Sequence, residues 1–371
     1  MTAGGSAVAA LSTAAPVTER VDAVLDGFLR EQEGLWHTPE RRPVLDTLRR
    51  FVLGGGKRLR PAFCHLGWRS ARPSSGTADD AAIVAGAALE LFHCFALIHD
   101  DLIDGSALRR GEPSVHERFA IDHARRWGRA CRPGEAAHVG RSIALLCGDL
   151  CASWSDLLFS RCDAPPGRLR AARELFAAAR AEAIAGEYLD LLSHLPGTTG
   201  GRHAVARAVE VARLKTARYT VTRPLQIGAA LAGGDPRLVR GYLAVGDPLG
   251  EAYQLRDDVL GVFGDPRRTG KAGLDDLRQG RLTVLLGLAF ATADDGQLRT
   301  LRSLVGDPGL DAAGVDTVRS ILVECGALAA TERRIRRDQE TALNALAALD
   351  LPDDVRAALT RLAEAVTQRS R

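Results

Sequence analysis

Residues 81–104 read AAIVAGAALELFHCFALIHDDLID and decide the fold, because a long apolar run ends there in a group of aspartates. The run reaches the length of a membrane span, but Glu90 and His93 interrupt it and its many alanines make it only weakly hydrophobic. It is too long for a typical strand, and alanine and leucine favour helix. The stretch therefore predicts a buried core helix over about 78–104 with an acidic end.

The rest of the chain shows the same helical character. Of the 371 residues 46% are hydrophobic and only 5% aromatic, which allows one large core or two modest ones and favours helix over strand. Further helices are expected from about residue 17 and over roughly 138–162, 167–192, 202–232 and 236–261, with polar loops over 105–117 and 264–276. No apolar and polar alternation is evident, so no sheet is expected. The sequence predicts an all-α fold, a single large helical bundle over 17–371 that follows a disordered tail over 1–16.

Charge and cysteine usage exclude several classes of protein. The net charge of +3 is too balanced to indicate nucleic-acid binding. The seven cysteines contain no C-x-x-C pair, so we expect them to be reduced and mostly buried, as in a cytoplasmic protein. Residues 1–16 lack the basic start and dense apolar stretch of a secretory signal, and no transmembrane segment is expected.

Two acidic clusters each end a long apolar helix. In the first, Asp100 and Asp104 are four residues apart and therefore share one helix face. Their mutual repulsion would be relieved by a divalent cation, and magnesium typically takes one or two carboxylates together with water and phosphate oxygens. Asp101 points to another side and suits a supporting position. The second cluster is Asp257 with Asp258.

Basic residues accompany both clusters. The segment GGKRLRP at 55–61 puts cations on a glycine-rich turn before a helix, where guanidinium groups and backbone N–H groups suit phosphate oxygens. Arg109 and Arg110 follow the first cluster closely, and Lys271 follows the second. Together these residues indicate magnesium-assisted binding of a diphosphate.

These motifs resemble the trans-isoprenyl diphosphate synthase (polyprenyl synthetase) family from about residue 20 to the C-terminus. The matching segments occur in the order of the family: GGKRLRP at 55–61, ELFHCFALIHDDLIDGSALRRGEPSVH at 90–116, LKTARYT at 214–220, YQLRDDVLGVFGDPRRTGK at 253–271 and DDLRQGR at 275–281. The resemblance implies an isoprenoid-synthase helical bundle with a central active site. It also implies condensation of an allylic diphosphate (dimethylallyl, geranyl or farnesyl) with isopentenyl diphosphate.

The resemblance assigns roles to individual residues. Magnesium would be held by Asp100, Asp104 and Asp257, with Asp101 and Asp258 in support. Isopentenyl diphosphate would be bound by Lys57, Arg60, His93 and Arg110. The allylic diphosphate would be bound by Arg109, Lys215, Thr216, Gln254 and Lys271. One departure is Gly261, which stands where the family pattern usually has a third aspartate.

Product length should depend on the residues one turn before the first aspartates. Phe95 and Ala96 precede Asp100 by five and four residues, where a growing tail would pass, while Phe92 lies a turn deeper and can simply pack in the core. A single aromatic at this place, with no insertion in the aspartate motif, resembles geranylgeranyl diphosphate synthases. The expected product has twenty carbons, with the fifteen-carbon farnesyl diphosphate as the alternative.

Two other functions share part of these motifs. A class I terpene cyclase also begins with an aspartate-rich cluster, but its second metal motif is not found: Asn344 is the only asparagine, and Ala348 and Pro352 occupy the following four-residue steps. A non-catalytic partner subunit of another prenyl synthase is the second alternative, to which Gly261 gives some room. The resemblance further implies a homodimer, and the basic end at 369–371 either closes over the site or is a solvated tail.

Overall fold

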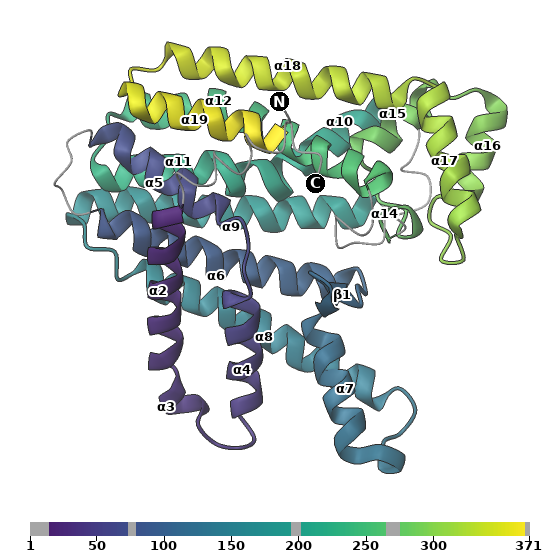
Figure 1. Ribbon diagram of the computed structural model, residues 1–371, viewed down its shortest axis with the longest axis horizontal. Coiled ribbons are helices and arrows are strands. Elements are labelled where there is room, and N and C mark those ends of the chain that lie inside the picture. Colours follow the sequence, from purple (N-terminus) through teal and green to yellow (C-terminus); the bar gives the residue numbers. More distant parts are fainter. Residues whose placement is uncertain (1–14, 73–78, 194–201, 265–274, 368–371) are drawn as a thin grey trace. The chain divides into compact units, whose positions relative to one another are not determined.

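The computed structural model describes residues 15–72, 79–193, 202–264 and 275–367. Within these ranges the chain is almost entirely helical (Figure 1), which confirms the all-α prediction. The chain forms two compact units. The N-terminal unit contains the described residues 15–65 and 79–165, and the C-terminal unit contains 66–72, 166–193, 202–264 and 275–367.

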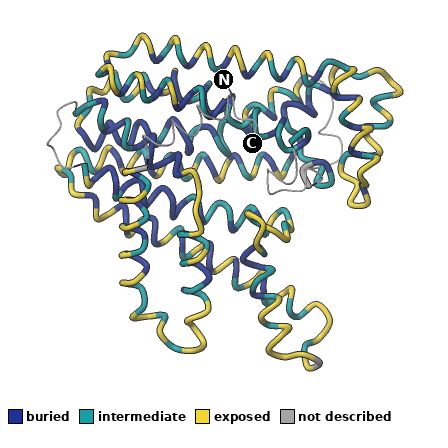
Figure 2. The backbone as a smooth tube through the Cα atoms, viewed as in Figure 1, coloured by how far each residue is buried: buried dark blue, intermediate teal, exposed yellow. Residues whose placement is uncertain are grey.

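The N-terminal unit is built around α6, the helix that contains the long apolar run. Its elements in chain order are α2 (Ala15–Glu31), α3 (Glu33–Trp36), α4 (Arg42–Leu53), the first part of α5 (Leu59–Ala71), α6 (Asp80–Ile103), β1 (Leu108–Arg109), β2 (Glu112–Pro113), α7 (Val115–Trp127), the 3-10 turn η1 (Gly128–Ala130) and α8 (Glu135–Phe159). Helix α6 packs mainly against α8, which also packs against α7. Exposed residues gather at the α3–α4 end and at the tip of α7 (Figure 2).

Both α6 and α8 are long and apolar enough to pass a composition test for membrane spans. In α6, 72% of the most apolar window is buried inside the fold, as in the core helix that the sequence predicts. The corresponding share in α8 is 44%, because Leu145, Leu146 and Leu157 face outward. The core helices of globular proteins reach the same length and hydrophobicity, so these two properties alone do not indicate a membrane span.

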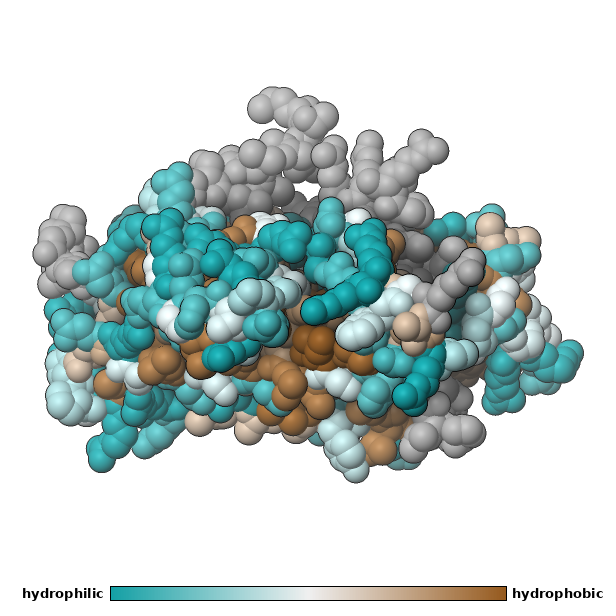
Figure 3. Space-filling view, turned by 90° about the horizontal axis from the view of Figure 1, so that it is seen from below, coloured by the Kyte–Doolittle hydropathy of each residue, from teal (hydrophilic) through white to brown (hydrophobic). Residues whose placement is uncertain are grey.

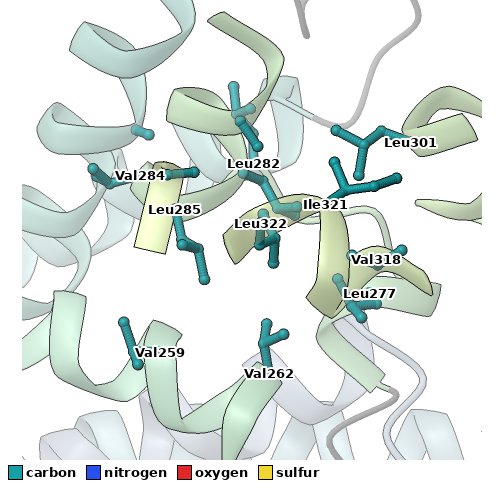
Figure 4. Close-up of a cluster of buried hydrophobic side chains, with 14 of the residues drawn as sticks. Val259, Val262, Leu277, Leu282, Val284, Leu285, Leu301, Val318, Ile321 and Leu322 are labelled. Carbon is teal, nitrogen blue, oxygen red and sulfur yellow. The ribbon is translucent and has the colours of Figure 1, made fainter. Parts of the chain in front are cut away.

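The C-terminal unit is built around α12. It contains the end of α5, α9 (Pro166–Ser193), α10 (Arg202–Val211), the π-helix η2 (Ala212–Thr222), α11 (Arg223–Ala232), α12 (Pro236–Phe263), α14 (Asp275–Arg278), α15 (Val284–Thr292), α16 (Asp295–Leu304), α17 (Ala312–Glu324), α18 (Ala327–Ala348) and α19 (Asp353–Thr367). Helix α12 packs against α18 and η2, and α9 packs against η2 and α11. In Figure 4, Val259 and Val262 project from α12 toward a buried apolar cluster that includes Leu285 and Leu322.

Three local expectations were wrong. Helix α2 begins at Ala15, so the last two residues of the expected tail are helical, while residues 1–14 lie outside the described part of the chain. Helix α7 was not foreseen, and it begins inside the polar loop expected over 105–117. The same loop also contains the antiparallel pair β1–β2, although no sheet was expected.

Cysteine usage agrees with the expectation from the sequence. All seven cysteines lie within the described residues and are free thiols, and five of them are buried. Burial raises the pKa of Cys147 and of Cys94 to about 12, which keeps these thiols protonated and unreactive.

Candidate active site

The first acidic cluster forms the C-terminal end of α6. Asp100 and Asp101 lie in the last turn, and the backbone N–H of Asp104 caps the helix by donating to the Asp100 carbonyl at 2.9 Å. The Asp101 side chain is only 1% exposed and that of Asp100 15%. The Nε of Arg109 donates to both oxygens of Asp101, at 3.0 and 3.1 Å, and its Nη2 donates to Asp100 at 3.1 Å. One guanidinium therefore fixes two of the three aspartates.

The β1–β2 hairpin explains how Arg109 reaches these carboxylates. Leu108 pairs with Pro113 and Arg109 with Glu112, which leaves Arg110 and Gly111 as the two turn residues. Both turn residues have positive φ, 56° and 78°, as a type I′ hairpin turn requires. The turn sends Arg109 back to α6, while Arg110 donates a hydrogen bond to the Gly55 carbonyl.

Burial and charge shift the pKa values of Asp101 and Arg109 in opposite directions. Burial raises the pKa of Asp101, and the hydrogen bonds and charge of Arg109 oppose that rise. Burial alone would lower the pKa of Arg109, but bonding to Asp101 and the charge of Asp100 raise it instead. Arg109 therefore remains a cation at every physiological pH.

The glycine-rich segment before α5 is held by a residue that the sequence did not single out. Arg58 is buried at φ 45°, a left-handed backbone that is unusual outside glycine. Its guanidinium donates to Glu90 on α6 at 2.8 Å, to Asp22 on α2 at 2.9 Å and to the Val52 carbonyl at 2.8 Å. These contacts fix the loop, so that its neighbour Lys57 is exposed whereas Arg60 is buried.

His93 lies on α6 within reach of the arginines of this unit. Burial and then the positive charges of Arg60, Arg110 and Arg109 lower its pKa well below the usual value. His93 is therefore neutral near pH 7 and can donate one hydrogen bond without adding charge. The N-terminal unit thus brings Arg60, Arg109 and Arg110 close enough to His93 for their charges to act on it.

The second acidic cluster lies near the end of α12 in the C-terminal unit. Asp258 is buried and accepts a hydrogen bond from the Gln254 amide at 2.8 Å, while Asp257 is half-buried. Arg256 turns to other partners, the two oxygens of Glu332 on α18 at 2.6 and 2.8 Å and the carbonyl of Thr367 at 2.9 Å. Gly261 follows Asp257 by one helical turn and is half-buried.

Lys215 and Thr216 lie in the π-helix η2, a conformation that is rare and often found at functional sites. The Lys215 ammonium contacts Asp190 at 2.7 Å and Glu187 at 2.8 Å, both on α9. Neither carboxylate was singled out from the sequence, although their three-residue spacing puts them on one helix face.

Two glycines allow neighbouring helices to approach η2 closely. A Cβ atom on Gly186 of α9 would lie 2.2 Å from the backbone nitrogen of Lys215. A Cβ atom on Gly250 of α12 would lie 2.5 Å from the Cα atom of Ala217. Backbone packed this tightly on both sides holds the turn that carries Lys215 and Thr216.

The residues expected to control product length lie on α6. Phe95 and Ala96 are half-buried, and Phe92 is fully buried, as expected for a core residue. The Phe95 ring lies 5.4 Å from the Phe92 ring and 4.6 Å from the His99 ring, measured between centroids. Lys271 and residues 369–371 lie outside the described part of the chain.

The carboxylates of the first cluster fit a magnesium ion. Among the described residues no three His, Cys, Asp or Glu side chains gather closely enough to hold a metal by themselves. Magnesium needs no such cage, because it usually takes one or two carboxylates and completes its octahedron with water and substrate phosphate. Asp100 and Asp104, one turn apart at the end of α6, suit that number. Asp101 directs both oxygens at Arg109, which fits a supporting place.

Comparisons with known proteins agree with this fold. The sequence profile of the Polyprenyl synthetase family matches residues 42–322. The chain is 31% identical over 340 residues to (2E,6E)-farnesyl diphosphate synthase of Mycobacterium tuberculosis (strain ATCC 25618 / H37Rv), covering 90% of this chain and 83% of that protein. It is also 31% identical over 304 residues to geranylfarnesyl diphosphate synthase of Aeropyrum pernix, covering 81% and 86%.

A solved structure is more similar still. The geranylgeranyl pyrophosphate synthase from Corynebacterium glutamicum, complexed with isoprenyl diphosphate and magnesium, matches with a TM-score of 0.87 and 36% identity over 95% of this chain and 98% of that one. The matching family and these relatives are prenyl diphosphate synthases, prenyltransferases that use divalent metal ions. The chain belongs to the polyprenyl synthetase family, and its activity is that of a trans-prenyl diphosphate synthase. The names of its relatives differ in product, so family membership leaves chain length open.

Proposed function

We propose that this chain is a geranylgeranyl diphosphate synthase, which extends dimethylallyl, geranyl or farnesyl diphosphate with isopentenyl diphosphate to a twenty-carbon product. The observation that carries this proposal is the Phe95 ring, held between Phe92 and His99 just over one helical turn before Asp100. A ring just over one turn before the aspartates would block further growth of the prenyl chain. Farnesyl diphosphate is the second candidate product, favoured by the relative of that name in Mycobacterium tuberculosis.

The metal in this proposal is magnesium, held by Asp100, Asp104 and Asp257 with Asp101 and Asp258 in support. When bound, it would neutralise charge that develops on the departing diphosphate. The structurally similar enzyme from Corynebacterium glutamicum is complexed with magnesium and isoprenyl diphosphate, which supports this assignment.

The diphosphates are assigned to two sets of residues. Isopentenyl diphosphate would bind Lys57, Arg60, His93 and Arg110. The allylic diphosphate would bind Arg109, Lys215, Thr216, Gln254 and Lys271. The contacts of Arg109 with Asp101 and Asp100, and of Lys215 with Glu187 and Asp190, hold each cation in place before substrate arrives. Fixed cations of this kind stabilise developing negative charge without reorganising during the reaction.

The chain's own residues would then direct the chemistry. The allylic carbon–oxygen bond breaks with its electron pair leaving on the diphosphate, whose charge Arg109, Lys215 and Lys271 stabilise. The double bond of isopentenyl diphosphate attacks the allylic cation, and the proton lost from the adduct passes to the departed diphosphate. Apolar side chains along α6 would exclude water, which would otherwise capture the cation.

A homodimer in a cytoplasmic setting completes the proposal. Apolar side chains reach the surface in a band between polar ones (Figure 3). On α9, Ile184, Tyr188 and Leu191 are large, exposed and spaced four and three residues apart, so they share one helix face that a second copy could cover. Light scattering on the purified chain would test this, and substitution of Tyr188 by Glu should favour the monomer.

The product assignment is tested by incubating the purified chain with magnesium, isopentenyl diphosphate and each of the three primers, followed by mass analysis. Twenty-carbon product from all primers is expected, and Phe95→Ala should lengthen it. Ile103→Ala, an exposed change beside the same aspartates, is the matched control and should leave the lengths unchanged.

Other outcomes would point to other functions. Fifteen-carbon product from the unaltered chain would favour the farnesyl alternative. Hydrocarbon or alcohol formed without isopentenyl diphosphate would indicate a terpene cyclase. Complete inactivity of a folded chain would indicate a partner subunit of another synthase.

A further inference from the structure

Three aromatic rings follow one another along a single face of α6. Phe92, Phe95 and His99 are spaced by three and four residues, the spacing of neighbours on a helix surface. Phe95 and His99 meet edge to face, with centroids 4.6 Å apart and an interplanar angle of 60°. Phe92 is tilted against the other side of Phe95 at 5.4 Å. The Phe95 ring is therefore supported on both sides, by a buried ring and by a ring next to the aspartates.

The His99 ring is fixed by α8. A Cβ atom on Gly148 would lie 2.2 Å from Cδ2 and Nε2 of His99, so the ring rests directly on the backbone of α8. Nε2 donates a hydrogen bond to the Leu145 carbonyl at 3.2 Å and lies 3.7 Å from a carboxylate oxygen of Asp149. The His99 side chain is only 21% exposed. Because α8 fixes the His99 ring, this ring can in turn fix the orientation of the Phe95 ring.

We propose that His99 and Gly148 are positioning residues for product length, because they fix the orientation of the Phe95 ring. The inference rests on the proposed function, in which Phe95 stops the growing chain. It adds that the position of the Phe95 ring, which limits product length, is determined by α8 as well as by α6. Glycine at position 148 is required because any side chain there would push the His99 ring off α8.

Removing the His99 ring should let the Phe95 ring change its orientation, although the Phe95 ring itself remains. In His99→Ala, the Phe95 side chain loses its edge-to-face neighbour and gains space to rotate toward α8. An edge-to-face ring pair is worth a factor of about three to ten in population. The fraction of product longer than that of the unaltered chain should therefore rise about three- to tenfold.

The experiment compares four variants by mass analysis of products from a farnesyl primer. His99→Ala should lengthen the products, His99→Phe should restore the original length because it keeps the ring, and Phe95→Ala should lengthen them most. The double variant Phe95→Ala with His99→Ala should match Phe95→Ala alone, since His99 has nothing left to position. A purely structural role of His99 would lower stability or rate and leave product length unchanged.

Each failure has a distinct meaning. If Phe95→Ala lengthens the products and His99→Ala does not, the positioning inference is overturned while the proposed function stands. If the double variant gives longer products than Phe95→Ala alone, His99 acts independently of Phe95 and the inference is likewise overturned. If Phe95→Ala itself leaves the length unchanged, the proposed stop is wrong, and with it the inference.

Gly148→Ala tests the contact with α8. Because the added methyl group occupies the place of the His99 ring, longer or mixed products are expected, and the change should disappear in the Phe95→Ala background. Leu146→Ala, on the exposed face of the same helix, is the control and should leave product length unchanged. Thermal unfolding of each variant separates loss of fold from change of product, and unchanged lengths in a folded Gly148→Ala chain would refute the role of α8.

Discussion

The two acidic clusters look alike in sequence but are held in different ways. In the N-terminal unit, Asp101 is buried and bound by both a charge and several hydrogen bonds from Arg109. In the C-terminal unit, Asp258 is buried and bound by the neutral amide of Gln254. A carboxylate fixed by a guanidinium is oriented more strongly than one fixed by an amide. The contact with Arg109 therefore orients Asp101 more strongly than the contact with Gln254 orients Asp258.

The largest effect should come from removing a principal metal ligand in either unit. Asp100→Ala and Asp257→Ala should each lower kcat about a thousandfold or more, because charge on the departing diphosphate loses its main stabilisation. Steady-state assays with saturating magnesium would measure this. Asp122→Ala, an exposed change on α7, is the control. If Asp257→Ala kept activity within about tenfold of the unaltered chain, the second cluster would be dispensable for the metal.

The next prediction compares the Arg109 guanidinium, which supports Asp101, with the Gln254 amide, which supports Asp258. Asp101→Asn removes the charge of one of the two carboxylates that Arg109 binds, leaves Asp100 as the other, and should lower the free energy of unfolding by about 3 kcal/mol. Asp258→Asn keeps the size of the side chain, and its remaining oxygen can still accept from the Gln254 amide, so a loss of about 1 kcal/mol is expected from this contact. Urea unfolding of both variants gives the difference. Equal losses would mean that the two clusters are held equally firmly.

The third prediction concerns the pH dependence of stability that comes from His93 in the N-terminal unit. The pKa of His93 is lowered by burial and by neighbouring positive charge, so the unfolded chain binds a proton there that the folded chain does not. Stability should therefore fall as pH decreases below about 6.5, by up to about 1.4 kcal/mol per pH unit from this group. His93→Gln should flatten the profile of unfolding free energy between pH 5 and 7 relative to the unaltered chain. A parallel profile in the variant would show that His93 titrates normally.

The smallest effect is expected at the position where the second cluster departs from the family pattern. Gly261→Asp adds a carboxylate one turn after Asp257, but the principal ligand position is already occupied. We expect kcat to change by less than about threefold. A tenfold gain at low magnesium would show instead that the absent carboxylate limits the site. Assays over a range of magnesium concentrations would distinguish the two.

Much of this architecture could be read from the sequence, for a physical reason. Helix α6 was foreseen because a long alanine- and leucine-rich run has few alternatives to a buried helix. Helix α7 was missed because it begins directly after the hairpin, inside a polar and glycine-containing segment that is typical of a loop. The β1–β2 pair was missed because two residues per strand are too few to show alternation.

The sequence proposed the residues of the candidate site but not the residues that support them. Asp100, Asp104, Arg109 and Lys215 belong to motifs whose order along the chain is informative. Arg58 with Glu90, and Lys215 with Asp190, are partners brought together from distant parts of the sequence, and no local pattern indicates them. The π-helix also lay beyond prediction, because residues 202–232 have the apolar spacing of one continuous α-helix. The structure has η2 in the middle of this stretch, where α9 and α12 pack against it.

The close approach of α9 and α12 to η2 has a consequence for how this enzyme can evolve. At Gly186 and Gly250 the obstacle is backbone, so every other amino acid fails for the same reason, regardless of its polarity or size. Saturation mutagenesis should find both positions closed to all substitutions, a pattern unlike the graded tolerance of ordinary core sites. Sequences that evolve from this one can substitute Phe95 and so change the product, but they must keep Gly186 and Gly250.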